Sequence, residues 1–163
     1  MLFRSAALDL SNDEININYA NSNLYSYVNY DGSFSLVNFA TNVNDGVWRY
    51  IVWTLQPNGT YNYYINGILT YTATGIYPKL ITRNANRLLT NNTNSLNGSM
   101  DEFRFYNRAV SSSEVSILYY YPNSIIYASN FYSIIPTNSL SLYYPFDNIS
   151  DSYSIIPTTG LTM

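Results

Sequence analysis

Apolar and polar residues alternate with a period of two along most of this sequence, and Asn-Gly or Asp-Gly pairs separate the alternating runs. The stretch Glu14–Tyr19 (EININY) alternates most strictly, which predicts a strand with one buried and one wet face. Asn-Gly and Asp-Gly favour tight hairpin turns, because the central residues of those turns need positive φ angles. The turn signals recur roughly every 8 to 12 residues, a spacing typical of an antiparallel β-sandwich or jelly roll.

The same pattern predicts individual elements. The expected strands are Glu14–Tyr19, Leu24–Tyr30, Phe34–Phe39, Trp48–Leu55, Thr60–Ile65, Ile68–Thr74 and Ser99–Tyr106. Ser111 and Glu114 form a capping box, which predicts the start of a helix that ends before Pro122. We therefore predict an all-β fold, an antiparallel β-sandwich of the jelly-roll type, with one short helix near residues 111–120.

The residue types that the chain lacks exclude several classes of function. It contains no Cys and no His, which excludes a disulfide scaffold, a thiol nucleophile, a Ser-His-Asp triad and a histidine-ligated zinc site. A net charge of −3 argues against nucleic acid as a partner, because binding to a phosphate backbone needs clustered Lys and Arg. No run of about 18 apolar residues is present, so we expect no membrane insertion, and the segment Met1–Ser5 shows no secretory signal pattern.

Three stretches carry longer motifs: Asp45–Thr54 (DGVWRYIVWT), Tyr64–Gly67 (YING) and Asn97–Val115 (NGSMDEFRFYNRAVSSSEV). Together they resemble the laminin-G-like, concanavalin A-like jelly-roll family. The resemblance covers about residues 2–121. It implies a sandwich that recognises a glycan or a protein surface.

The order of the motifs departs from that family. Its usual opening strand, L-x-x-Y-Y-P-F-D, does not precede Met1, but a similar sequence lies at Leu140–Asp147, between two copies of the hexapeptide YSIIPT. We predict a LamG-like domain lacking its usual opening strands at 1–121, a linker-like segment at 122–139, and the displaced opening strand with a tail at 140–163. Two interpretations stay open: a permuted domain in which this strand fills the vacant place, and a fragment in which it begins a next module.

Asp101 is the candidate metal ligand. Alternation places it on the same face as Phe103 and Phe105, so we expect it to point inward. A buried carboxylate needs hydrogen bonds or a cation. The resemblance implies that Asp101 contributes to a structural Ca²⁺ site; the alternative is that Asp101 caps a neighbouring loop.

Aromatic side chains are the candidates for ligand binding, because their faces can stack on sugar rings while Asn amides bond to hydroxyls. Trp53, Tyr61 and Tyr63 are the candidates here, chosen from a wider set of possible stacking residues: Tyr25, Tyr27, Trp48, Trp53, Tyr61, Tyr63, Tyr64 and Tyr71. About half of such residues in a sandwich belong to its core. Glu102 and Arg104 are expected to form an exposed ion pair. Asp101 and Glu102 should face opposite sides, and the E-x-D-x-x-E motif of glycosidases that share this fold is absent, so we predict that the protein is not an enzyme.

Two functional hypotheses follow. The first is a non-catalytic binding or adhesion module that recognises carbohydrate or a protein surface. The second is a structural module of a larger fibre, shell or virion-type assembly with no small ligand, whose partners are copies of itself or neighbouring modules of a longer chain. The resemblance favours the first hypothesis, while the single lysine, Lys79, and the repeated hexapeptide favour the second. Either role predicts an extracellular location or a particle surface.

Overall fold

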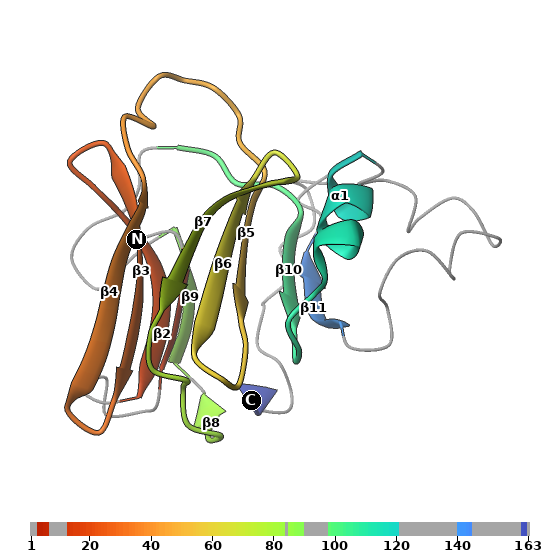
Figure 1. Ribbon diagram of the computed structural model, residues 1–163. Coiled ribbons are helices and arrows are strands. Elements are labelled where there is room, and N and C mark those ends of the chain that lie inside the picture. The colour runs from red at the N-terminus through yellow and green to blue at the C-terminus, as the bar shows by residue number, and fades with distance from the viewer. Residues whose placement is uncertain are drawn as a thin grey trace, which may run out of the picture.

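A computed structural model of the chain describes residues 3–6, 13–83, 85–89, 98–120, 140–144 and 161–162. In these residues two antiparallel sheets lie against each other as the layers of a β-sandwich (Figure 1). The first sheet has the order β4-β3-β2-β1-β9 and the second has the order β5-β6-β7. The architecture confirms the predicted all-β sandwich with a short helix.

The element bounds follow the alternating runs closely. The first sheet contains β1 (Phe3–Ala6), β2 (Glu14–Ala20), β3 (Asn23–Tyr30), β4 (Ser33–Ala40) and β9 (Ala85–Leu88). The second sheet contains β5 (Ile51–Leu55), β6 (Thr60–Ile65) and β7 (Ile68–Thr74). Two further ribbons pair β10 (Phe103–Tyr106) with β11 (Leu140–Tyr144), and β8 (Thr82–Arg83) with β12 (Leu161–Thr162). The helix α1 spans Ser112–Tyr120.

The dipeptides Asp31-Gly32 and Asn66-Gly67 adopt the turn conformations that their sequences predict. Asp31 and Gly32 have φ angles of 49° and 75°, and Asn66 and Gly67 have φ angles of 52° and 78°. Two successive positive φ angles match the right-handed twist of the flanking strands, so each pair closes a hairpin in register. A Cβ at Gly67 would lie 2.9 Å from the Cδ1 atom of Tyr119, which shows how closely the β6–β7 turn approaches α1.

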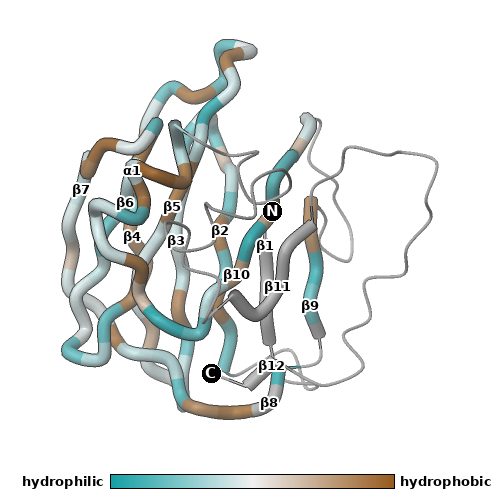
Figure 2. Tube along the Cα trace, turned by 90° about the vertical axis from the view of Figure 1, so that its right-hand side faces the viewer, coloured by the Kyte–Doolittle hydropathy of each residue, from teal (hydrophilic) through white to brown (hydrophobic). Residues whose placement is uncertain are grey.

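The core lies between the two sheets. Along β2, hydrophilic and hydrophobic residues alternate (Figure 2). Alternate residues of β3 (Leu24, Ser26 and Val28) are buried, and they face the fully buried Tyr61 and Tyr63 of β6. Period-two burial on both facing strands is what gives the sandwich a single interior.

A hydrogen bond joins the two layers at the centre of this core. The Ser26 and Tyr63 hydroxyl oxygens lie 2.5 Å apart, and both residues are 0% exposed. The ring of Tyr63 also stacks on Phe39, with centroids 4.5 Å apart. The ring of Tyr63 therefore fills the core, and its hydroxyl forms a hydrogen bond with a residue of the opposite sheet.

A second apolar cluster holds the helix on the sandwich. It contains Tyr64, Val110 and Val115, with Tyr50 and Val52 packed beside them. Successive residues of a strand face opposite sides, so Tyr64 lies on the other face of β6 from Tyr63. Since both faces of β6 are covered, it is the strand around which the second sheet is organised.

The capping box predicted for α1 is formed. The backbone N–H of Ser111 donates to Oε2 of Glu114 at 2.7 Å, and the Glu114 N–H donates to the Ser111 hydroxyl at 3.3 Å. Arg108 adds a two-pronged pair with the Glu114 carboxylate, at 2.9 and 2.6 Å. These contacts hold the pKa of Glu114 at about 2, below its usual 4.5, with the Arg108 hydrogen bond as the largest cause.

Two predicted strands begin later than expected. β5 begins at Ile51 rather than Trp48, and β10 begins at Phe103 rather than Ser99. Glu102 has a φ of 54°, which interrupts an extended backbone immediately before β10.

Replacing Tyr63 with Phe should destabilise the fold by about 1–3 kcal/mol, because it leaves the buried Ser26 hydroxyl without its partner. The matched control is Tyr71→Phe, whose side chain is 47% exposed on β7 and should change the free energy of unfolding by less than about 0.5 kcal/mol. Urea denaturation measures both. Equal effects of the two substitutions would contradict the role of the inter-sheet hydrogen bond.

Replacing Glu114 with Gln should make unfolding less dependent on pH. Because the folded pKa of Glu114 lies below its unfolded value, its contribution is present above about pH 4.5 and is lost as the pH falls toward 2. The difference in unfolding free energy between the wild type and Glu114→Gln should therefore shrink across that window, as measured by urea melts at each pH. A difference that stays constant from pH 6 to 2 would contradict this assignment.

Candidate binding site

A hollow of about 370 Å³ opens at one end of the sandwich. Its walls come from the β4–β5 loop, from the ends of β2 and β3, and from Gly98 and Ser99. In Figure 1 this loop crosses the top of the molecule, beside the segment that leads into β10. The hollow therefore lies on the loop rim, where side chains can reach a ligand without disturbing the core.

Trp48 is the most prominent side chain of this rim. It lines the hollow and is 67% exposed, and its neighbour Val47 is 59% exposed. A large indole left in water at the mouth of a hollow is a typical feature of a binding surface. Tyr19 and Asn44 also line the hollow, adding a second aromatic ring and an amide.

An ion pair holds the loop that carries Trp48. Arg49 donates from Nη1 to Oδ1 of Asp45 at 2.7 Å and from Nη2 to Oδ2 at 2.5 Å. The same guanidinium donates to the carbonyls of Val43 and Val47, and the Val47 N–H donates to Asp45 Oδ1 at 3.1 Å. The Arg49 hydrogen bond, followed by that of the Val47 N–H, holds the pKa of Asp45 well below its usual range. Hydrogen bonds among residues on both sides of Trp48 therefore hold the loop that exposes it.

A second cavity, of about 310 Å³, lies at the seam between β5 and β10. Every residue of both strands lines it, together with Ile15 and Ile17 of β2. Where the structure describes the chain, β5 pairs with β6 and β10 pairs with β11, but β5 and β10 do not pair with each other. Side chains rather than ladder hydrogen bonds therefore join β10 to the second sheet.

Charged and polar groups stand on the walls of this cavity. Arg104 Nη2 lies 2.5 Å from Glu102 Oε2, and their side chains are only 5% and 14% exposed. The prediction of an exposed ion pair was therefore wrong, because both side chains turn toward the cavity rather than toward solvent. The Trp53 indole nitrogen and the Tyr106 hydroxyl are buried there with no hydrogen-bond partner among the described residues.

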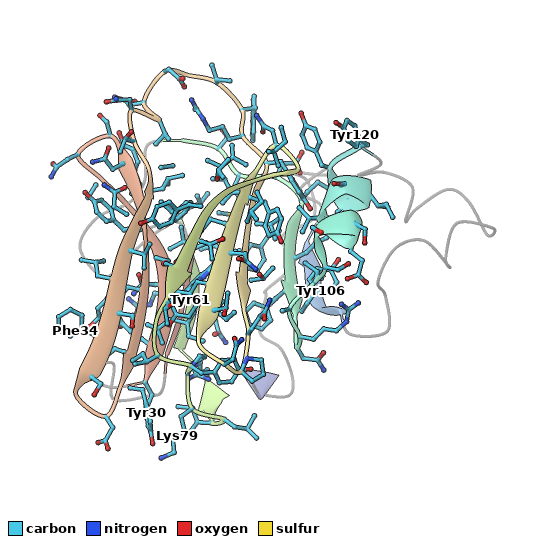
Figure 3. The ribbon with its side chains drawn as sticks, viewed as in Figure 1. Tyr30, Phe34, Tyr61, Lys79, Tyr106 and Tyr120 are labelled. Atoms are coloured by element: carbon cyan, nitrogen blue, oxygen red, sulfur yellow. The ribbon has the colours of Figure 1, made fainter. Side chains whose placement is uncertain are left out.

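The aromatic candidates from the sequence lie in the interior. Tyr61 and Tyr63 are both 0% exposed, and Trp53 packs edge-on against Tyr61 and stacks on Tyr63. The Tyr61 hydroxyl donates to the carbonyl of Ile76, and burial raises the pKa of Tyr61 to about 12. Figure 3 shows Tyr61 within the sandwich and Tyr120 at the outer end of α1. These three rings build the core, and Trp53 also lines the seam cavity.

Asp101 does not point inward as alternation predicted. It is exposed, and its Oδ1 accepts a hydrogen bond at 2.8 Å from the N–H of the next residue, Glu102. The expectation of an inward side chain was wrong because the positive φ of Glu102 breaks the strand at this point. Among the described residues, no group of three or more Asp, Glu, His or Cys side chains is arranged to hold a metal ion.

Sequence reasoning counted Trp48 among the aromatic residues that could stack on a sugar but did not choose it as a candidate, and it gave Arg49 no role in binding. The prediction placed Trp48 inside a strand because aromatic and β-branched residues follow it without a break. The spacing of Asp45 and Arg49 around Gly46 was the available signal, since an i, i+4 acid–base pair across a glycine turn can close a loop.

Comparison with known protein families decides the classification. Residues 3–116 match the concanavalin A-like lectin/glucanases superfamily. The chain belongs to this superfamily. Domains of the laminin-G-like type within it are typically binding modules. A comparison with curated proteins finds no match.

One solved structure is similar to part of the chain. It is an S-layer domain-containing protein from Clostridium thermocellum, with 19% sequence identity and a TM-score of 0.36. The similarity covers 71% of this chain and 60% of that one. Within the described part of this superfamily member, no helix has the length and apolar character needed to cross a membrane.

Replacing Trp48 with Phe should remove most of the acrylamide-quenchable tryptophan fluorescence. The protein has two tryptophans, and only Trp48 is strongly exposed while Trp53 is packed against the core. Trp53→Phe is the matched control and should keep a strongly quenchable signal. Equal quenching of the two variants would show that the rim loop does not present Trp48 to solvent.

Proposed function

We propose that this domain is a non-catalytic module that binds carbohydrate in the rim hollow, with Trp48 as the stacking platform. The observation that carries the proposal is the 67% exposure of Trp48 at the mouth of a hollow of about 370 Å³. Such a module acts outside the cell or on the surface of a particle.

The chemistry of the rim suits a saccharide. One face of a sugar ring is apolar and packs on an indole, while its hydroxyls need hydrogen-bond donors and acceptors. Asn44 lines the hollow and offers both, and Arg49 offers donors. The Asp45–Arg49 pair orders the loop before any ligand arrives, which lowers the entropy cost of binding.

Asp101 and Glu102, the carboxylates that line the seam cavity, suit a binding role better than glycoside hydrolysis. Hydrolysis needs two carboxylates roughly 5 to 9 Å apart that both face the substrate. Glu102 is held by Arg104 at 2.5 Å, and Asp101 accepts a hydrogen bond from its own neighbour. The ion pair with Arg104 opposes protonation of Glu102, so this residue is poorly suited to the role of general acid. This arrangement supports the proposal of a module that holds its ligand without cleaving it.

Replacing Trp48 with Ala should weaken glycan binding and leave the fold intact, because the side chain is mostly exposed. Loss of one stacking ring should weaken binding by at least about ten-fold, the equivalent of about 1.4 kcal/mol. Tyr120→Ala is the matched control, since Tyr120 is 69% exposed at the far end of α1. A glycan array followed by calorimetry on any hit measures the effect.

The same array tests the calcium prediction for Asp101. It should be run with millimolar Ca²⁺, with chelator, and with Asp101→Asn. A loss of binding on chelation that Asp101→Asn reproduces would support the ion at that residue. A uniformly blank array with the wild-type protein would overturn the carbohydrate proposal.

A second candidate function is a structural module of a larger assembly. Large apolar side chains are exposed on both sheets, with Phe34 at 64% and Leu36 at 57% on β4, and Ile68 at 67% on β7. Exposed apolar residues on outer strands favour packing against another protein surface. Light scattering across a concentration series would detect self-assembly, and a purely monomeric protein with a glycan hit would exclude this candidate.

A further inference from the structure

The ribbon of β10 and β11 joins two segments that lie far apart in the chain. β11 pairs antiparallel with β10 in a register that sets Phe103 against Tyr144 and Phe105 against Leu142. Residues 121–139 connect the end of α1 to β11. A chain of that length can span at most about 65 Å, which is enough to reach a neighbouring copy as well as the same molecule.

Side chains rather than ladder hydrogen bonds join this ribbon to the rest of the sandwich. Where the structure describes the chain, β10 and β11 form a separate two-stranded sheet, and the seam cavity separates β10 from β5. An isolated two-stranded ribbon is only marginally stable in water. Because β11 pairs only with β10 in the described part of the chain, its release leaves both main sheets paired.

We propose that β11 is an exchangeable strand, which β10 accepts from a second copy of the chain as well as from its own. A second copy offers the identical five-residue sequence in the identical register, so the exchanged pair has the same contacts as the closed one. In the sequence, the hexapeptide YSIIPT occurs on each side of β11, at Tyr132–Thr137 and Tyr153–Thr158. The repeat indicates that the segment between the two copies is a separate unit of the chain.

Local concentration decides which pairing dominates. A tether of this length gives a chain's own β11 an effective concentration on the order of millimolar. Closed molecules therefore dominate in dilute solution. Exchange takes over where copies are crowded to a comparable density, as in an array or on a particle. The proposal does not depend on the rim hollow, so a blank glycan array leaves it unaffected.

A disulfide trap tests the exchange, because the wild-type chain has no cysteine. One chain carries Phe105→Cys and a second, differently tagged chain carries Leu142→Cys, and the two are mixed in a thiol redox buffer from about 10 μM to 1 mM. Facing positions of an antiparallel pair lie within disulfide reach. The expected result is a mixed disulfide dimer on a non-reducing gel whose yield rises with concentration.

The matched control mixes Leu142→Cys with Ser113→Cys, an exposed position on α1 that does not face β11. Mixed dimer no more abundant than in this control at every concentration would overturn the proposal. The double variant Phe105→Cys/Leu142→Cys is the positive control. Its disulfide should form within the monomer, which shows that the two facing positions can be bridged. The pair Phe103→Cys and Tyr144→Cys repeats the test at a second register position, in case loss of Phe105 prevents folding.

Discussion

The contact between Tyr63 and the opposite sheet is the interaction on which the rest of the structure depends. The sheet β5-β6-β7 has only three short strands, and its apolar face can be shielded from water only by packing against another element. It therefore packs on the larger sheet. Tyr63 makes that contact with its ring on Phe39 and its hydroxyl on Ser26. Tyr64, the next residue, packs on the opposite face of β6 against Val110 and against Val115 of α1. One strand thus fixes the order of the layers.

The tyrosine-rich composition has two different uses in this molecule. In the core, a tyrosine fills volume like a phenylalanine, and its hydroxyl needs a partner, which Ser26 and the Ile76 carbonyl supply. At the surface, aromatic rings such as Tyr120 stay exposed. Since few charges are present, the rim loop relies on one well-placed ion pair, Asp45 with Arg49, for its order.

Local signals predicted the hairpins and the helix well, because each is specified by residues that are neighbours in sequence. The turns at Asp31-Gly32 and Asn66-Gly67 and the capping box at Ser111 and Glu114 are examples. The same reasoning was wrong for Asp101. Alternation assumes an unbroken extended chain, and a single positive φ at Glu102 is enough to reverse the face. The candidate site was predicted less well, since exposure of an aromatic ring is a property of the packed molecule.

The sequence by itself determined the all-β class, the strand ends at the Asp31-Gly32 and Asn66-Gly67 hairpins, the helix start and the superfamily. These depend on period and on short motifs, which act over a few residues. Only the tertiary structure decided which aromatic rings are buried, where Trp48 stands, and that Leu140–Tyr144 pairs with β10. Those features depend on which surfaces meet across the two layers, and contacts between residues distant in sequence leave no periodic trace in either segment.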